Sequence, residues 1–499
     1  MVMNWLGARK PDHPLADEKS AKEVFATLSR NDAEAAIEEI RHWIESVMAT
    51  EGFRIDRRAE LLLMLEEAAQ AHQRKLSRDY LSSPRPSKFR EVQLWRVLSG
   101  IWTDFAVAYS ACIGEAAADS GSASRLKAQL PLLCVHALRA LAAQLKWAYM
   151  HYEPGNAAVW ESLGRVYQYA ETRKFARDAV ALAAGASAAS SAEGEFMKAL
   201  MLGASSPDCL TPLDIELAER IVAHFSASFV ISDVHQPQTT HNWIDLSRGE
   251  PPKRLTQMPP ASPGLRFFAA DVAIAQLDAM LRVLEGGAVP SDLNLGGTYE
   301  AARVLVVLRH LKAHWSATPP VRKHDRHEVK HKLSVVRGLG NVLARIRGDE
   351  TQPKTESWET RNISAGGIAA LVGSAQSDPS GIGELVGLSV EGGSSSCSVG
   401  MVRRCTRPAQ QPAGIAIRIF ARSSFAVALG GGDTPDALLL NDDRTLREVV
   451  LVCLREGIFD KRTSPTITFE EHSYLLIPVE ISETGNDFEI ARYRVMQQS

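Results

Sequence analysis

The chain has 499 residues, too many for one hydrophobic core, so two or three domains are expected. Its 56 basic and 59 acidic side chains nearly balance, which excludes a whole-chain field that would recruit a nucleic-acid polymer or an anionic membrane surface. The 6 cysteines form no CxxC pair, which argues against a disulfide framework or a zinc module and suits a reducing compartment.

The N-terminal residues 1–14 lack the apolar core of a signal peptide. The most apolar long segment, residues 130–149, is interrupted by polar side chains: His136, Arg139, Gln144 and Lys146. A membrane-spanning helix needs about 20 predominantly apolar residues. We therefore expect no secretion, no membrane insertion and a cytoplasmic location.

Residues 16–315 are rich in Ala, Leu, Glu and Arg, with apolar residues three and four apart. Ile37, Ile40 and Ile44, for example, fall on one stripe of a helix. Clusters of Pro, Gly and Ser interrupt this pattern at several places: residues 82–87, 117–123, 154–155, 185–194 and 236–263. The pattern predicts an α-helical domain over residues 1–315 with roughly eight to ten helices.

One stretch of this region is typical of a tetratricopeptide-like unit. A turn at residues 151–156 precedes a helix with Trp160, Leu163, Tyr167 and Ala170 on one stripe. A repeat array needs about three copies for stability and only one is evident, so a bundle and a solenoid-like array both stay open. The helical region either contacts a partner protein or packs only on the rest of the chain.

The segment 236–263 contains six prolines and is too polar and too long for a plain connector. Such loops are usually functional or disordered, and both readings stay open. After it, residues 265–285 and 298–315 read as two amphipathic helices. Thr318-Pro319-Pro320 ends the helical region, because proline disfavours helix in the residue before it.

Beyond Pro320 the pattern changes to alternation between apolar and polar residues. It predicts short strands separated by Gly, Ser, Asp or Pro turns: residues 385–390, 398–404, 414–420, 449–454, 466–469 and 474–480. This predicts an antiparallel β-barrel over residues 319–430. Residues 431–499 are expected to add strands packed on or next to it.

Two short segments of this β region carry chemistry. Arg322 and Arg326 are four residues apart, so their guanidiniums can close on one object whether the chain is extended, roughly 13 Å apart, or helical. The planar fork of arginine matches both a phosphate and the O6/N7 edge of guanine. A ligand that carries guanines and phosphates is therefore the expected guest.

The second segment is a polar corner at residues 362–367. Asn362 and Ser364 are two apart, so both side chains leave the same face of an extended chain. Gly366 and Gly367 then remove the side chains that follow, so the backbone can approach a flat or anionic ligand closely. The apolar run 368–372 reads as a strand that returns to a core.

Together the two segments resemble the signature of PilZ domains, Arg-x-x-x-Arg followed by Asn-x-Ser-x-x-Gly, across residues 319 to about 429. PilZ domains are small β-barrels that bind cyclic di-GMP. The resemblance implies that Arg322 and Arg326 clamp phosphate and guanine. It also implies that Asn362 and Ser364 hydrogen-bond a guanine edge or the backbone, and that Gly367 lets the chain approach.

The resemblance further implies a first barrel strand over residues 327–336. Two departures from the family pattern stand out. Val321 occupies a place where many members carry a second basic residue, which leaves open whether one or two ligand molecules bind. Residues 338–346 form an insertion that is expected to make a helical turn at the barrel's edge.

The resemblance implies a cytoplasmic bacterial receptor that binds cyclic di-GMP and signals through its helical region to an unidentified protein partner. Motility, pili or polysaccharide synthesis would be the controlled process. The alternative is a protein-interaction scaffold with a degenerate, non-binding barrel. In that case Arg322 and Arg326 are ordinary surface arginines, and residues 362–367 are an ordinary hairpin turn.

Other chemistry is less well supported. Residues 334–343 read as a strand followed by Gly338-x-Gly340, which is how a dinucleotide-binding fingerprint begins. Leu343 stands where that fingerprint needs its third glycine. His324, His327 and His331 read as a solvated basic edge rather than metal ligands. Three further arginines either extend the anion site or form a solvated rim: Arg403, Arg404 and Arg407. We do not include them in the predicted site. No GxSxG elbow or P-loop occurs, so we predict no enzyme, catalytic residue, metal or cofactor.

Overall fold

The protein is described from a computed structural model. The described residues are 11–28, 32–82, 86–182, 189–287, 290, 293–297, 299–319, 324–349, 353–373, 381–392, 397–432, 434–442 and 444–498. Arg322 lies outside them. The chain forms two compact units. The helical unit comprises Met1–His151, Gly155–Pro207 and Pro212–Pro320, and the β unit comprises Tyr152–Pro154, Asp208–Thr211 and Val321–Ser499.

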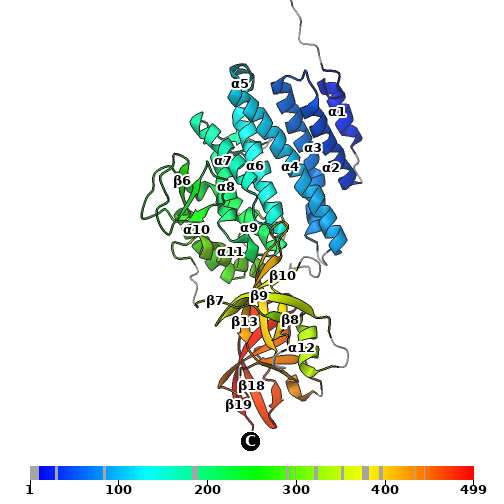
Figure 1. Ribbon diagram of the computed structural model, residues 1–499, viewed down its shortest axis with the longest axis vertical. Helices are drawn as coiled ribbons and strands as arrows, with labels where there is room; N and C mark the ends of the chain where they lie inside the picture. The colour runs from blue at the N-terminus through cyan, green and yellow to red at the C-terminus, as the bar shows by residue number, and fades with distance from the viewer. Residues whose placement is uncertain are drawn as a thin grey trace, which may run out of the picture. The chain divides into compact units, whose positions relative to one another are not determined.

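The helical unit contains eleven α-helices in the part of the chain that the structure describes (Figure 1). They are α1 (Glu18–Thr27), α2 (Ala33–Ala49), α3 (Ile55–Tyr80), α4 (Lys88–Ala118), α5 (Ser120–Leu126), α6 (Leu130–Met150), α7 (Ala157–Thr172), α8 (Ala192–Gly203), α9 (Pro212–His224), α10 (Asp271–Glu285) and α11 (Ala301–Trp315). This exceeds the expected count, partly because the single residue Asp119 separates α4 from the short α5.

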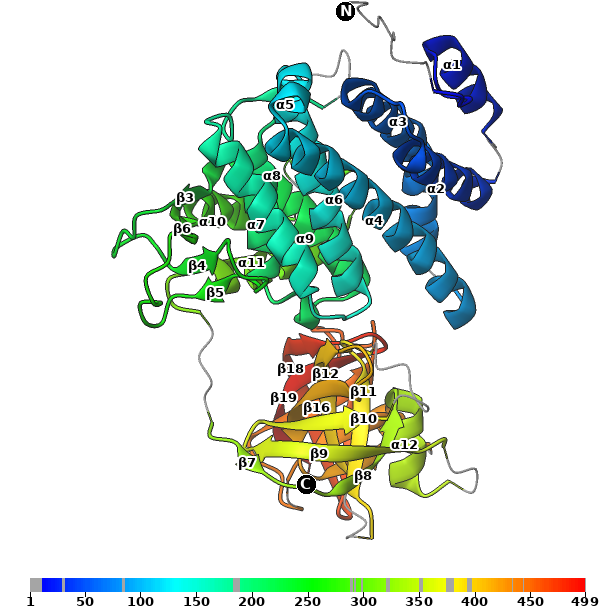
Figure 2. The same ribbon diagram turned by 45° about the horizontal axis from the view of Figure 1, so that its top comes forward.

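The periodicity of the sequence explains how these helices pack. Ile37, Ile40 and Ile44 are all buried, so the predicted stripe of α2 is confirmed. Trp160 and Tyr167 of α7 are likewise at most 2% exposed. Helices α2, α3 and α4 lie side by side, and α4 also packs on α6 (Figure 2). Helix burial of this kind supplies most of the stability of a bundle.

Helix α4 is long and apolar enough to cross a membrane by length and composition alone, and the bent pair α5 and α6 would also pass if read as one span. Half of the apolar window of α4 is buried within the structure. Core helices of bundles meet the same criterion. The expectation of no membrane insertion stays a prediction.

The helical unit also contains strands that the sequence pattern did not predict. A four-stranded antiparallel sheet has the order β3-β6-β4-β5, with β3 (Val230–Ser232), β4 (Asn242–Asp245), β5 (Lys253–Arg254) and β6 (Leu265–Ala269), and β1 (Val180–Ala181) pairs with β2 (Ala189–Ser190). Two of these strands, β4 and β5, lie in the segment 236–263. The predicted helix at 265–285 was wrong in its first five residues, which form β6.

The β unit begins with a closed antiparallel barrel. Its strands are β7 (His327–Glu328), β8 (Lys332–Arg337), β9 (Glu356–Ser364), β10 (Gly367–Val372), β11 (Leu385–Val390), β12 (Ser398–Thr406) and β13 (Ala413–Ala421). The order is β10-β13-β12-β11-β8-β9, and a further pairing between β10 and β9 closes the ring. Inward residues such as Val335, Trp358 and Ile417 fill its core. The predicted first strand at 327–336 was wrong in that it is interrupted, forming β7 and β8.

The remaining strands form a second, six-stranded sheet with the order β14-β15-β16-β19-β18-β17. These are β14 (Ser424–Val427), β15 (Ala437–Leu440), β16 (Val449–Arg455), β17 (Thr466–Phe469), β18 (His472–Thr484) and β19 (Phe488–Gln497). Val342 of α12 (Leu339–Arg347), Met401 of β12 and Phe488 of β19 share one core cluster. The insertion is therefore a helix held between barrel and second sheet. The predicted class, a helical region followed by an antiparallel barrel with extra strands, is confirmed.

Candidate functional site

The polar corner predicted at residues 362–367 is the hairpin between β9 and β10. Asn362 and Ser364 are the end of β9, Gly367 begins β10, and the turn between them is Ala365-Gly366. Asn362, Ser364 and Gly367 are all half-buried. Strand β7 lies at this end of β9, and α12 lies at its other end (Figure 2).

A β-bulge decides which way this corner faces. Ala370 pairs with Thr360 but Ala369 pairs with Asn362, so Arg361 is an extra residue on β9. Thr360, which precedes the bulge, is 2% exposed and faces the barrel interior. Because side chains alternate along a strand, the extra residue turns Asn362 to the outer face of the barrel. Bulges of this kind are common next to binding sites.

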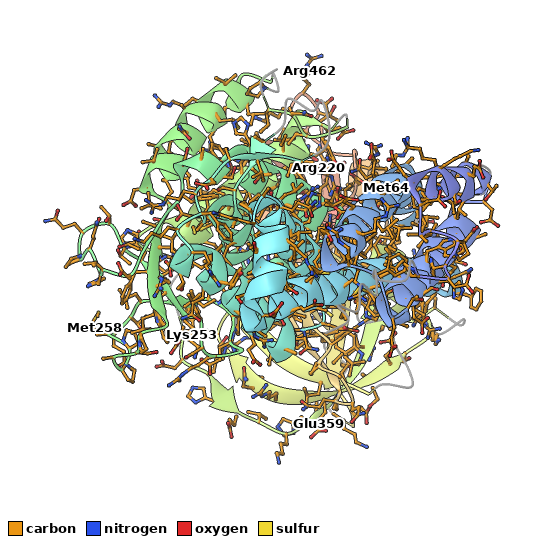
Figure 3. The ribbon with its side chains drawn as sticks, turned by 90° about the horizontal axis from the view of Figure 1, so that it is seen from above. Met64, Arg220, Lys253, Met258, Glu359 and Arg462 are labelled. Carbon is orange, nitrogen blue, oxygen red and sulfur yellow. The ribbon has the colours of Figure 1, made fainter. Side chains whose placement is uncertain are left out.

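Beyond the bulge, the register aligns outer-face residues of neighbouring strands in two rows, which we call the outward rows. The first row is Ser364, Gly367 and Arg418, and the second is Asn362, Ala369 and Ala416. Directly paired residues of antiparallel strands project to the same face. Glu359, before the bulge, is exposed on the same strand (Figure 3). Gly367 and Ala369 at the middle of the two rows carry almost no side chain, so they form a flat floor beside Asn362 and Ser364, with Arg418 at the far end of the first row.

The structure places the end of the arginine segment beside this corner. His327 pairs with Ile363, and the next position in the same register sets the exposed Arg326 opposite Ser364. His324 lies at the turn: a Cβ built on Gly366 would be 3.4 Å from its Cδ2. Two independent contacts thus bring residues 324–326 to the hairpin. Arg322 is outside the described residues, so its predicted role stays a prediction.

The packing of the barrel by itself requires glycine at position 367. A Cβ at this position would lie 2.7 Å from the carbonyl oxygen of Ile417 on β13, closer than real Cβ atoms come. The Ser364 hydroxyl also has an internal partner, since it donates to the carbonyl oxygen of Gly367 at 3.2 Å. These contacts within the barrel explain why serine and glycine stand at the two motif positions even without a ligand. They also hold the corner in one shape.

Sequence reasoning passed over a charged group next to the corner. Arg418 pairs directly with Gly367, and its Nη1 lies 2.5 Å from Oε2 of Glu483 on β18. Oε1 of the same carboxylate accepts from Arg403 at 3.3 Å. The signal that could have found Arg418 is its place as a lone charge in the apolar run Ile415 to Phe420. Arg403 belongs to the trio that sequence analysis left open.

The glycine-rich segment at the start of α12 is a helix cap. Gly338 has φ +82°, and the N–H of Leu339 donates to the Asp487 carboxylate at 2.9 Å. A carboxylate therefore occupies the place that a phosphate takes at a dinucleotide-binding helix. Leu339 and Leu343 are buried in the core that α12 shares with the second sheet, so this helix has a structural role.

Residues His327 to His331 spell HExxH, a pattern that sequence reasoning overlooked. In zinc proteases that pattern needs a helix, which brings the two histidines onto one face. Here His327 lies in strand β7 and His331 follows it, so about 13 Å of extended chain separates them. Among the described residues no group of three or more His, Cys, Asp or Glu could hold a metal ion.

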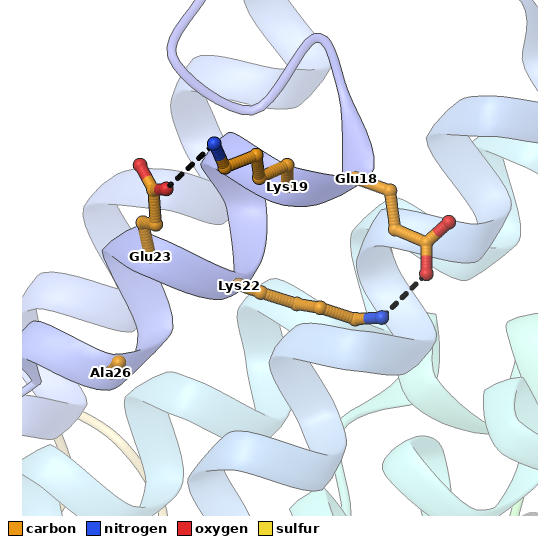
Figure 4. A pocket seen from close by; sticks show the side chains of 5 residues that line it. All are labelled: Glu18, Lys19, Lys22, Glu23 and Ala26. Atoms are coloured by element: carbon orange, nitrogen blue, oxygen red, sulfur yellow. Dashed lines mark hydrogen bonds and ion pairs between the residues drawn. The ribbon is translucent and has the colours of Figure 1, made fainter.

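One surface hollow lies on α1, lined by Glu18, Lys19, Lys22, Glu23 and Ala26 (Figure 4). Its charges pair within the helix, with Lys22 Nζ 2.6 Å from Glu18 and Lys19 Nζ 3.9 Å from Glu23. The four side chains are 67% to 88% exposed. Exposed pairs of this kind contribute little and leave no net charge to attract a ligand.

Comparison with known proteins gives one family. Residues 19–238 match the family described as "Cyclic-di-GMP receptor FimW, N-terminal domain". The match falls on the helical part of the chain, whereas the resemblance to PilZ domains falls on residues 319–430. A search of curated proteins found no match. Residues 19–238 are therefore similar to the N-terminal domain of a cyclic-di-GMP receptor, and PilZ membership of the barrel stays a prediction.

Proposed function

We propose that this chain, whose residues 19–238 match the FimW N-terminal family, is a cytoplasmic bacterial receptor that binds cyclic di-GMP on the outer face of its barrel. The observation that carries the site is the pairing of β7 with the end of β9. It brings Arg326 and the polar corner together, although 35 residues or more separate them in the sequence.

The chemistry of the site suits a guanine nucleotide. Arg326 offers a fork for a phosphate or for guanine O6/N7, and Arg322 would add a second fork. The Asn362 amide can both donate to and accept from a base edge. Ser364 and Gly367 shape the floor on which the ligand lies. Whether one or two molecules bind depends on Val321, which offers no charge.

Signalling would pass from the barrel to a protein partner of the helical region, in the control of motility, pili or polysaccharide synthesis. Arg322 follows Pro320 by two residues, so it belongs to the segment that joins the helices to the barrel. Ligand capture by Arg322 and Arg326 would order that segment and shift the population of domain arrangements. Small-angle scattering tests this step, and identical profiles with and without saturating ligand would contradict it.

Titration calorimetry of the full chain with cyclic di-GMP is the decisive experiment, with cyclic di-AMP as the matched nucleotide control. We expect saturable heat with the guanine compound and much weaker binding of the adenine compound, which lacks the O6 acceptor. No heat with either compound would exclude the receptor.

A second candidate function is a protein-interaction scaffold with a non-binding barrel. One observation favours it: the internal contacts of Gly367 with Ile417 and of Ser364 with Gly367 give both motif residues a role without any ligand. Under this alternative the chain binds a partner protein but gives no heat with cyclic di-GMP.

A further inference from the structure

Arg418 stands at the far end of the first outward row. It pairs with Gly367, which pairs in turn with Ser364. Neighbouring strands lie about 4.8 Å apart, so the Cα atoms of Ser364 and Arg418 are roughly 10 Å apart across the glycine. Arg326 continues the row on the opposite side. The flat floor therefore has an arginine at each end.

The present contacts of Arg418 leave its side chain accessible. Its guanidinium lies over the Phe420 ring, 5.6 Å from the centroid, and among the described residues it forms an ion pair with Glu483. The Arg418 side chain is 55% exposed. An ion pair this exposed contributes little to stability, so exchanging Glu483 for another anion costs little.

The charge balance of the same group favours an added anion. The Glu483 carboxylate forms ion pairs with two guanidiniums, those of Arg403 and Arg418, so the three side chains together carry a net charge of +1. If Arg418 turned to a ligand, Arg403 would keep Glu483 paired. The Glu483 side chain, which is 20% exposed, would therefore not be left as a lone carboxylate.

We propose that Arg418 is a further ligand-binding residue, which donates to a phosphodiester of the cyclic dinucleotide lying over Gly367 and Ala369. Glu483 holds this arginine in the free protein and gives it up to the ligand. A cyclic dinucleotide carries two phosphodiesters, which suits one arginine at each end of the floor. This inference rests on the proposed function and names a contact that the PilZ-like motif does not include.

The test is calorimetric titration of full-length variants with cyclic di-GMP. We expect Arg418→Ala to weaken binding about tenfold or more, because it removes a charge-assisted hydrogen bond. The matched control is Arg444→Ala, which removes an equal charge from another exposed pair of the β unit, 3.1 Å from Glu470. The control is expected to bind within about twofold of the wild type.

A second substitution tests the role of the carboxylate. Glu483→Gln removes the competing anion, so we expect tighter binding, by about two- to tenfold. Weaker binding by this variant would overturn the release of Arg418 from Glu483. If Arg418→Ala does not fold, Arg418→Lys keeps the charge but loses the fork, and it is expected to weaken binding as well.

The same titrations distinguish loss of the Arg418 contact from loss of cyclic di-GMP binding as a whole. If the wild type binds and both Arg418 variants bind within about twofold of it, Arg418 is no ligand residue while the receptor stands. If the wild type gives no heat, the receptor fails and this inference falls with it. Retained binding by Arg418→Ala beside lost binding by Arg326→Ala would confine the site to the motif residues.

Discussion

Gly367 and Ile417 approach so closely that a methyl group on Gly367 would lie 2.7 Å from the Ile417 carbonyl oxygen. The neighbouring Gly366 has ordinary room, since the nearest atom to a Cβ there is Cδ2 of His324 at 3.4 Å. Two adjacent glycines of one turn therefore differ sharply in what they allow.

We expect Gly367→Ala to lower the free energy of unfolding by about 1–3 kcal/mol, because the backbone of β13 must move. Gly366→Ala is the matched control and is expected to stay within about 0.5 kcal/mol of the wild type. Urea denaturation of the full-length variants measures both. Equal effects at the two positions would contradict the close approach of β13.

Arg326→Ala is expected to weaken cyclic di-GMP binding by about 1 to 3 kcal/mol, the value of one good bidentate contact. The control is Arg462→Ala, on an exposed turn of the β unit (Figure 3). Calorimetry measures both affinities. Wild-type affinity in Arg326→Ala would remove this arginine from the site.

A buried hydrogen-bond network ties three helices of the helical unit. Glu66 Oε2 accepts from the Tyr109 hydroxyl at 2.7 Å and lies 2.9 Å from His136 Nδ1. Tyr109→Phe should lower the free energy of unfolding by about 1.5–3 kcal/mol, because it removes a donor from a buried carboxylate. Ser110→Ala removes a hydroxyl that has no hydrogen-bond partner among the described residues, so it should be near neutral. Denaturation followed by helical circular dichroism compares the two.

Acid should destabilise the helical unit through its buried carboxylates. Burial raises the pKa of Glu216, but the charges of Lys146 and Arg220 and their hydrogen bonds outweigh it and lower the pKa below 4.5. The unfolded chain therefore binds more protons than the folded one in acid. The stabilisation is complete above pH 4.5 and is lost as the pH falls through the lower pKa of the folded state.

Glu216→Gln tests this pH dependence. Its free energy of unfolding should be lower than that of the wild type at neutral pH and should fall less on acidification. Glu161→Gln is the control, because Glu161 forms an exposed pair with Arg165 and is 56% exposed. The midpoint of urea denaturation at several pH values measures both variants. Parallel pH profiles for Glu216→Gln and the wild type would contradict the lowered pKa.

Long periodic segments made the helices predictable, as the buried stripe of α2 shows. The segment Leu265–Ala269 was not predictable in the same way, because its run Leu-Arg-Phe-Phe-Ala has neither period. Four of its five residues are buried in the sheet. A short apolar run is equally consistent with a buried strand and with a buried turn of helix, so periodicity cannot distinguish the two. The two-residue strands and the short β4 depend on tertiary pairing, so local propensity does not reveal them.

For the candidate site, the two-residue spacing correctly set Asn362 and Ser364 on one face. Which face that is could not be predicted, because the extra residue Arg361 leaves no mark on the local pattern. Arg418 escaped prediction for a related reason. Its place beside Gly367 depends on the register between β10 and β13, which lie far apart in the sequence.

The extra residue in β9 has a consequence for comparing relatives of this chain. A chain that keeps a residue at position 361 but pairs it regularly, without the bulge, would turn Asn362 and Ser364 toward the barrel interior and bring Ile363 to the outside, without altering any letter of the Asn-x-Ser-x-x-Gly signature. A chain that lacks Arg361 altogether would keep both side chains outside, because Asn362 would then follow the inward Thr360 directly. Among homologues, the pairing register of the strand before that signature, and not the signature itself, should therefore separate chains that display amide and hydroxyl from chains that hide them.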